Sequence, residues 1–240
     1  MSFLSCLMRS LPTKLLNNSP ASSTTQQLLK FRSFASRVSS MEKESLDTES
    51  DSDNEWNPRE LKGKSEFWRR KMRTFHSILD INKDGVISFD DFRILVDRFV
   101  YLGHLNPLHQ KEFNEVVQSM WEERWGTISP YNLVTTEQYL EDMYHIVNDK
   151  QLRKKVHNFL PYLFKAVDKD KSGYITAEEF KLFFNCLGLP RDVAIVSFTA
   201  VDQNLDGRVS LKEFVKTGRD FFLTEDQRSP SKLFWGPLVK

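Results

Sequence analysis

The chain has 240 residues, 40% of them hydrophobic, and a formal net charge of +1 at pH 7. This length and composition suit one or two domains with a sizeable core, and no apolar run approaches the roughly 20 residues that a membrane-spanning helix needs. Because residues 1–41 hold five basic and no acidic residues, the rest of the chain is mildly acidic, which argues against a nucleic-acid partner.

Residues 1–41 form a basic leader, rich in serine and with Arg and Lys scattered among Leu and Phe. This composition is typical of a mitochondrial transit peptide, and the run RSFA at 32–35 resembles a processing site. The alternative is a disordered extension with no targeting role. We therefore expect a mitochondrial location if the leader is functional and a cytoplasmic one otherwise. Residues 42–60 are predicted to be a disordered acidic linker, because they cannot bury enough apolar area to offset chain entropy.

The next predicted unit consists of a helix, a twelve-residue acidic loop at 80–91 and a second helix. Apolar residues recur at helical spacing on both sides of the loop. Those before it are Phe67, Trp68, Met72, Phe75, Ile78 and Leu79, and those after it are Phe89, Phe92, Leu95, Val96 and Phe99. Helical structure is expected to begin near Asn57 to Leu61, and the basic run RRKMR at 69–73 is interpreted as one solvated face.

Three loops share one pattern: DINKDGVISFDD at 80–91, DKDKSGYITAEE at 168–179 and DQNLDGRVSLKE at 202–213. Each has Asp first, Asp or Asn third, Asp or Ser fifth, Gly sixth, Ser or Thr ninth, and Asp or Glu twelfth. This is the EF-hand calcium loop, in which alternate residues supply oxygens to a cation that prefers roughly six to eight of them. An acidic surface turn would explain one partial match, but three full matches flanked by helical patterns indicate metal binding.

The pattern assigns side-chain ligands to alternate positions and a main-chain carbonyl to the seventh. The predicted ligands are Asp80, Asn82, Asp84, Val86, Ser88 and Asp91; Asp168, Asp170, Ser172, Tyr174, Thr176 and Glu179; and Asp202, Asn204, Asp206, Arg208, Ser210 and Glu213. Each set holds three carboxylates, which repel one another until a cation neutralises them, so Ca²⁺ is the expected cofactor. Asp91 is one methylene shorter than a glutamate. The loop that starts at Asp80 is therefore the expected site of competing Mg²⁺, which is smaller and prefers octahedral coordination.

A fourth unit is predicted because the apolar faces of such units pair, and three is an odd number. The stretch at 127–138 aligns with the pattern, but its first, third, fifth and twelfth positions are Thr127, Ser129, Tyr131 and Gln138. No carboxylate falls on a ligand position, so this loop is interpreted as a structural partner that binds no ion. The predicted fold is all-α: four EF-hands in two pairs, the second hand degenerate, packed as one compact globule.

The four hands with a silent second one, the segment FWRRKM, the aromatic-rich first pair and the tail LFWGPL resemble the sarcoplasmic calcium-binding proteins, invertebrate EF-hand proteins to which calexcitin is related. The resemblance covers about residues 65–240. It implies a globule with its lobes packed together, a soluble calcium and magnesium buffer of muscle or nerve, and a tail whose Leu233, Phe234 and Trp235 fold back into the apolar cleft. The predicted division is an N-terminal pair at 61–148, a C-terminal pair at 149–222 and a tail at 223–240.

No catalytic arrangement is found in the sequence, and the five histidines show no zinc spacing, so we expect no enzyme. The expected partners are calcium ions, and the expected state is a monomer. A sensor would offer a Met-rich groove to its target, yet only Met72, Met120 and Met143 lie in the predicted folded region. The tail would also occupy that groove. A calcium buffer is the favoured function, and a sensor that exposes its groove to a target protein is the alternative.

Overall fold

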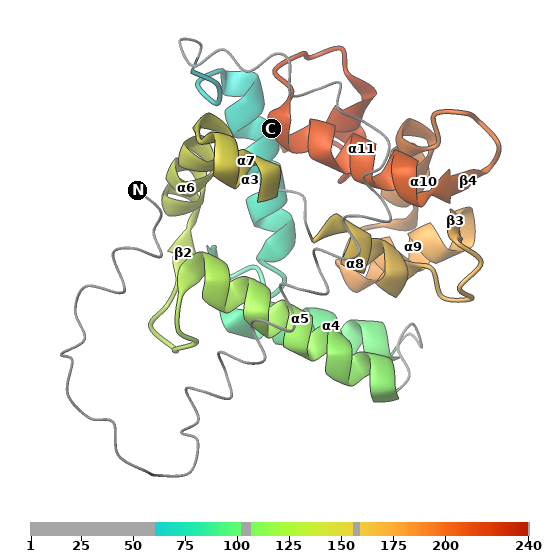
Figure 1. The fold of residues 1–240 in the computed structure, drawn as a ribbon, viewed down its shortest axis with the longest axis horizontal. Helices are drawn as coiled ribbons and strands as arrows, with labels where there is room; N and C mark the ends of the chain where they lie inside the picture. The colour runs from blue at the N-terminus through green and yellow to red at the C-terminus, as the bar shows by residue number, and fades with distance from the viewer. Residues whose placement is uncertain (1–60, 102–106, 156–158, 240) are drawn as a thin grey trace. The chain divides into compact units, whose positions relative to one another are not determined.

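Helices make up most of the part of the chain that the computed structural model describes, residues 61–101, 107–155 and 159–239 (Figure 1). The α-helices are α3 (Glu66–Leu79), α4 (Phe89–Tyr101), α5 (Pro107–Trp125), α6 (Thr136–Asn148), α7 (Lys150–Lys155), α8 (Leu160–Val167), α9 (Ala177–Cys186), α10 (Arg191–Val201) and α11 (Leu211–Leu223). The strands are β1 (Val86–Ile87), β2 (Val134–Thr135), β3 (Tyr174–Thr176) and β4 (Arg208–Ser210), and a 3-10 helix, η2, spans Pro230–Leu233. The predicted leader at 1–41 and linker at 42–60 lie outside the described residues. No described helix is long and apolar enough to span a membrane.

Residues of the loop pattern cap several of the helices that follow the loops. Thr176 and Ser210, at the ninth loop position, are the N-caps of α9 and α11, and each side chain accepts a hydrogen bond from the backbone N–H of the glutamate three residues later. The glutamate side chain accepts in turn from the N-cap backbone, which makes a capping box. Thr135 and Gln138 form the same box at the start of α6. The degenerate hand therefore keeps its helix start although its loop lacks the carboxylates.

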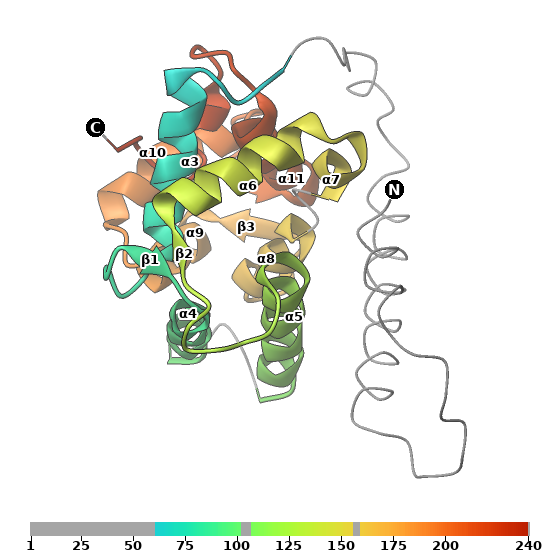
Figure 2. The same ribbon diagram turned by 90° about the vertical axis from the view of Figure 1, so that its left-hand side faces the viewer.

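Two short antiparallel ribbons join the loops in pairs. Ile87 pairs with Val134 in β1–β2, and Ile175 pairs with Val209 in β3–β4. All four side chains are buried, so the eighth loop residues anchor each ribbon to the core. Figure 2 shows β1 and β2 side by side. The predicted all-α fold of four EF-hands in two pairs, with a degenerate second hand, is confirmed.

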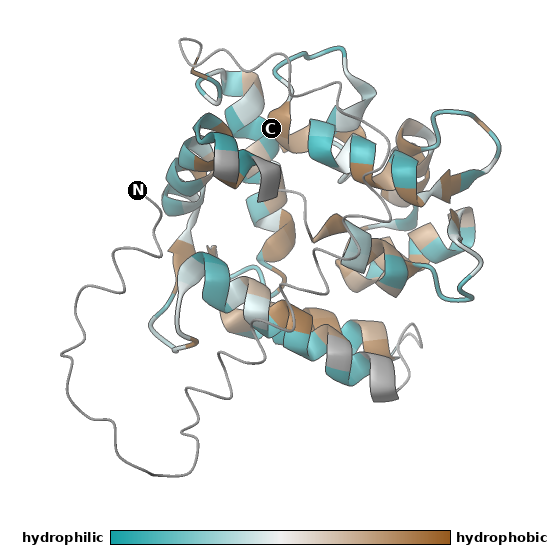
Figure 3. Cartoon of the chain, viewed as in Figure 1, coloured by the Kyte–Doolittle hydropathy of each residue, from teal (hydrophilic) through white to brown (hydrophobic). Residues whose placement is uncertain are grey.

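One hydrophobic core runs through all four hands. Hydrophobic and hydrophilic residues alternate along the helices (Figure 3), so each helix can turn an apolar stripe inward. Helix α3 packs on α6 in the first pair, and α9 packs on α10 and α8 on α11 in the second. Between the pairs, the ring centroids of Phe75 and Phe222 are 5.1 Å apart, and those of Phe99 and Phe183 are 6.2 Å apart. The two pairs thus share an aromatic interior.

The tail packs into this interior. Phe234 is fully buried, Trp235 is 3% exposed, and Leu233 is partly buried. The Trp235 ring centroid lies 4.8 Å from that of Phe75 in the first pair and 6.0 Å from that of Phe183 in the second. The segment around η2 also packs on α10 and α11. The tail therefore contacts both pairs at once.

Two expectations about α3 are wrong. Leu61 is not helical, and the helix begins at Glu66, because the Ser65 side chain caps it by accepting a backbone N–H hydrogen bond. The basic run at 69–73 is not one solvated face, since Lys71 has no exposed surface. Its side chain lies on the apolar side of the helix, among residues that are far away in the sequence.

Candidate metal centres

The three loops with the full pattern, called loop 1 (80–91), loop 3 (168–179) and loop 4 (202–213), share one backbone turn. Their fourth residues, Lys83, Lys171 and Leu205, have φ values of 62°, 58° and 60°, and the sixth-position glycines have φ values of 93°, 84° and 78°. A Cβ on these glycines would meet no atom within 4 Å, so glycine is required for its left-handed conformation and not for space. The turn wraps each loop back on itself, as a cation cage requires.

The loop at 127–138, called loop 2, folds differently. None of its residues has a positive φ. The side-chain amide of Asn132 donates to the carbonyls of Trp125 at 2.7 Å and Thr127 at 3.1 Å. The Asn132 side chain therefore ties the middle of the loop to its start, and no carboxylate stands at a ligand position. This arrangement does not fit a divalent cation.

The twelfth-position glutamates close loops 3 and 4 in the same way. Glu179 Oε1 accepts hydrogen bonds from the backbone N–H groups of Lys169 and Asp170, at 2.9 and 3.3 Å. Its Oε2 accepts from the backbone N–H and the hydroxyl of Thr176, both at 2.8 Å. Glu213 makes the equivalent four contacts in loop 4. These bonds tie α9 and α11 to the loops that precede them.

Asp91 makes the same four contacts in loop 1 with a shorter side chain. Its Oδ1 accepts from the backbone N–H groups of Ile81 and Asn82 at 2.9 and 3.1 Å. Its Oδ2 accepts from the N–H and the hydroxyl of Ser88 at 2.8 and 3.0 Å. Asp91 has no exposed surface, whereas Glu179 is 8% exposed. The shorter carboxylate of Asp91 therefore reaches the same kinds of donor as the glutamates of loops 3 and 4.

The first-position aspartates differ in one respect. Asp80 and Asp168 use both carboxylate oxygens, which accept from the N–H groups of the fifth and sixth residues of their loops at 3.0 to 3.1 Å. Asp202 accepts through Oδ2 from Gly207 at 3.0 Å, and its buried Oδ1 has no partner among the described residues. A buried carboxylate oxygen without a donor is costly, so this atom fits a site that takes a cation.

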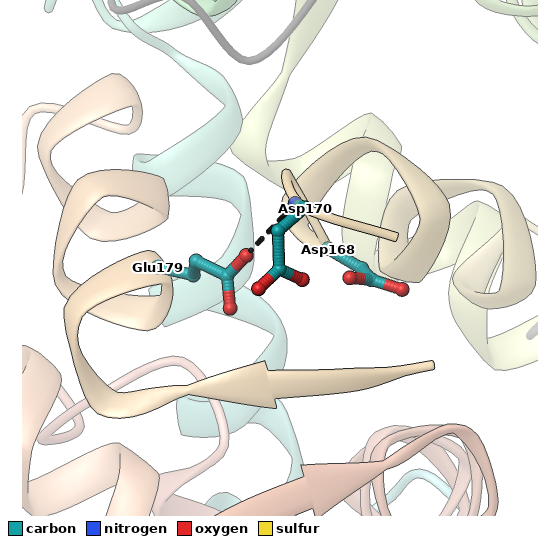
Figure 4. Close-up of side chains that lie close together, drawn as sticks. All are labelled: Asp168, Asp170 and Glu179. Carbon is teal, nitrogen blue, oxygen red and sulfur yellow. Dashed lines mark hydrogen bonds between the residues drawn. The ribbon is translucent and has the colours of Figure 1, made fainter. Parts of the chain in front are cut away.

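Loop 3 brings its carboxylates closest together. Asp168, Asp170 and Glu179 each offer an oxygen within 4.8 Å of the others, and Figure 4 shows the three side chains beside β3. Burial raises the pKa of the Asp168 carboxyl, and the Glu179 charge acts in the same direction against hydrogen bonds from Gly173 and Ser172. A divalent cation would relieve this crowding of negative charge. Within the described residues, loops 1 and 4 do not gather acidic groups at this spacing, and both have Asn at the third position.

Some of the remaining predicted ligands contact one another inside their loops. The Asn82 side-chain amide donates to Asp84 Oδ2 at 2.9 Å, and the equivalent pair in loop 4 does the same at 3.0 Å. The Ser172 hydroxyl donates to the main-chain carbonyl of Tyr174 at 2.9 Å. These contacts keep the predicted ligand oxygens near one another, and the ligand assignment itself stays a prediction.

The sequence reasoning missed two basic side chains that reach from the first hand to the second pair. Arg98 of α4 donates to the carbonyl of Cys186 at the end of α9, at 3.1 Å. Lys71 of α3 donates to the carbonyl of Phe221 in α11, at 2.5 Å. The signal for Lys71 was present, because it stands three residues after Trp68 on the apolar face of the helix.

Two family models match the chain: an EF-hand domain pair at residues 158–217, which is the second pair, and an EF hand at residues 77–96, which is the first hand. A sarcoplasmic calcium-binding protein from Perinereis vancaurica tetradentata is 37% identical over 175 residues, which cover 73% of this chain and 100% of that protein. This chain belongs to the sarcoplasmic calcium-binding protein family. The resemblance inferred from the sequence is confirmed. This chain is a calcium-binding EF-hand protein.

A second member of the family, from Hediste diversicolor, is 34% identical over 73% of this chain and 100% of its own length. Among solved structures, the coelenterazine-binding protein from Renilla muelleri, in its calcium-loaded apo form, matches with a TM-score of 0.60 and 25% identity over 72% of this chain and 99% of that one. The two family members that this chain covers completely carry the names of calcium-binding proteins and not of enzymes. This agrees with the expectation of a non-enzymatic protein.

Proposed function

We propose that this protein is an intracellular calcium buffer in which loops 1, 3 and 4 bind ions and loop 2 is silent. The observation that carries the proposal is the buried tail. A sensor opens on calcium and offers an apolar groove to a target helix. Here Phe234 and Trp235 fill the interior between the two pairs, so a target would have to displace two large buried aromatic side chains.

The contacts of the tail support a closed molecule. The Ser197 hydroxyl donates to the Phe234 carbonyl at 2.5 Å, and the Phe234 ring centroid lies 5.0 Å from that of Phe214. On the first pair, the Thr74 hydroxyl accepts from the backbone N–H of Val239 at 3.0 Å. The core is dominated by stiff phenylalanines, and Met72 and Met143 are the only buried methionines among the described residues, whereas promiscuous binding grooves are rich in adaptable methionines. An interior of this kind favours storage of calcium over recognition of a target.

We propose that Mg²⁺ competes with Ca²⁺, above all in loop 1. The short side chain of Asp91 supports this, because a single carboxylate oxygen suits the octahedral shell of Mg²⁺, at roughly 2.0–2.1 Å, better than the larger shell of Ca²⁺, at roughly 2.3–2.6 Å. In a resting cell calcium is scarce and magnesium abundant. Loop 1 would then take up calcium only after magnesium has left, which makes the protein a slow buffer.

Stopped-flow measurement of calcium uptake, with and without saturating Mg²⁺, tests this function. We expect a slow phase that appears only in the magnesium-loaded protein and follows magnesium dissociation. Glu179→Gln and Glu213→Gln are the controls: each should lower the number of bound calcium ions by one and leave the slow phase intact. An uptake rate that does not depend on magnesium would contradict the proposal.

A second candidate function is binding of a small organic molecule; the name of the Renilla muelleri protein says that that protein binds coelenterazine. The observation that favours it is that the indole N–H groups of Trp121 and Trp235, both buried, have no hydrogen-bond partner among the described residues. Each could donate to an acceptor on a ligand. Coelenterazine titration followed by tryptophan quenching separates the two functions, because a pure buffer should show no saturable binding.

For location, we propose mitochondria if the leader at 1–41 is functional and the cytoplasm, as in sarcoplasm, otherwise. The basic, serine-rich composition of the leader supports import. A fluorescent reporter fused to residues 1–41 decides between the two, with Arg32→Glu as the matched control for the presumed processing run. Sedimentation of the full chain tests the proposed monomer.

A further inference from the structure

The C-terminal end of α11 is held by donors from the first hand. Lys71 Nζ donates to the carbonyls of Phe221 and Thr224 at 2.5 and 2.6 Å, and the indole N–H of Trp68 donates to the carbonyl of Phe222 at 2.8 Å. Lys71 has no exposed surface. The last carbonyls of a helix lack partners within the helix and form the negative end of its dipole. An ammonium group at this point donates hydrogen bonds to these carbonyls and places a positive charge at the negative end of the dipole.

A lysine is a costly residue for this position. Burying its ammonium group costs free energy that an apolar side chain of similar length would avoid. The Glu225 and Asp220 carboxylates compensate part of this cost, and the ring centroids of Phe67 and Phe221 lie 5.1 and 5.4 Å from Nζ. Packing alone does not require a charge here. The charge gives the end of α11 one fixed place against α3.

Helix α11 connects this contact to a metal loop. Its first turn carries Glu213, whose carboxylate closes loop 4, and the carbonyl of Phe221 lies about 12 Å further along the helix axis. Helix α3 contacts α11 and leads directly into Asp80 of loop 1. A packed helix of this length moves as a rigid element, so an anchor at one end fixes the position of the other.

We propose that Lys71 is a positioning residue for loop 4: by anchoring the end of α11 to α3, it raises the calcium affinity of a site that it does not touch. Arg98 does the same for loop 3, because it holds the carbonyl of Cys186 at the end of α9, the helix that carries Glu179. The first hand thus tunes both loops of the second pair, with one basic side chain for each. This inference rests on the function proposed for loops 3 and 4.

Calcium titrations read from the amide NMR signals of Gly173 and Gly207 test the inference loop by loop. Each of these N–H groups donates to the first-position aspartate of its own loop at 3.0 Å, so its signal reports ligation of that aspartate. For Lys71→Met, the dissociation constant read at Gly207 should rise about tenfold, while that read at Gly173 stays within about twofold of the wild-type value. Arg98→Met is the matched variant and should give the opposite pattern.

Equal weakening at both glycines in Lys71→Met would indicate general destabilisation and would overturn the inference, as would an unchanged affinity at Gly207. Should Lys71→Met not fold, Trp68→Phe carries the same test, because it removes one donor to the end of α11 and keeps an aromatic ring in the core. Gly207 should again respond more than Gly173. A Gly207 signal that ignores calcium in the wild-type chain would contradict the proposed three-loop function itself.

Discussion

Asp91 and Glu179 occupy the same loop position and accept the same four hydrogen bonds, although their side chains differ by one methylene. We therefore predict that Asp91→Glu raises the preference of loop 1 for calcium over magnesium, because the longer carboxylate can give two oxygens to the larger ion. The reciprocal change Glu179→Asp should move loop 3 towards magnesium. Competitive calorimetry with both ions measures the preference, and an unchanged ratio in both variants would contradict the argument.

Lys71 should make the free energy of unfolding rise with pH. Burial lowers the pKa of its ammonium group from the usual 10.5 to about 7, against the opposing charges of Glu225 and Asp220. Between these two values the unfolded chain binds more protons than the folded one, so the free energy of unfolding contributed by Lys71 rises with pH across this window and levels off above it.

Urea unfolding of the wild type and of Lys71→Met, each in saturating calcium and at several pH values in this window, checks that prediction. The difference in unfolding free energy between the two should grow in favour of the wild type as pH rises. Other groups contribute equally to both proteins, including Cys186, whose thiol pKa burial raises to about 12. A difference that does not change with pH would sink the prediction.

Among the structural elements, loop 2 shows that an EF-hand loop can start a helix without forming a metal site. It keeps the capping box of Thr135 and Gln138 but lacks the left-handed turn of the other loops. We predict that a variant with Thr127→Asp, Ser129→Asp and Gln138→Glu binds no more calcium than the wild type, because its backbone does not wrap around an ion. Adding Asn132→Gly, which permits the turn, is the control that should allow another ion. Calcium stoichiometry by equilibrium dialysis decides, and an extra ion in the triple variant would count against the backbone argument.

The loops, the ribbons and the starts of the helices that follow the loops could be predicted from the sequence because each has a local cause. Glycine is needed for the turn, the ninth and twelfth residues cap the next helix, and the eighth residue anchors the ribbon. Burial of Lys71 and the start of α3 at Glu66 were not predicted. The position of Lys71 on the apolar face of α3 is a local signal for burial, but its partner at the end of α11 is 150 residues away in the chain, and local patterns do not report such a contact. The start of α3 is set by Ser65, whose side chain accepts a hydrogen bond from the backbone N–H of Trp68, and not by the residues from Asn57 to Leu61.

At the scale of the whole molecule, the tail should contribute a large share of the free energy of unfolding. Trp235 contacts Phe75 in one pair and Phe183 in the other, so its loss would leave a cavity where the pairs meet. We predict that Trp235→Ala lowers the free energy of unfolding by roughly 3–5 kcal/mol in saturating calcium. Leu238→Ala, at a partly buried tail position, is the control and should cost much less. Denaturant unfolding measures both, and equal small losses would mean that the tail does not join the pairs.

The buffer account stands on an interior that stays closed when calcium binds. Fluorescence of a hydrophobic dye, measured on the full chain in magnesium and again after saturating calcium, tests this most directly. A chain shortened after residue 226, which lacks η2, Phe234 and Trp235, provides the positive control for an exposed interior. We predict that the dye signal of the full chain stays unchanged or falls when calcium is added. A large rise would mean that calcium opens an apolar groove, which would contradict the buffer and favour a sensor.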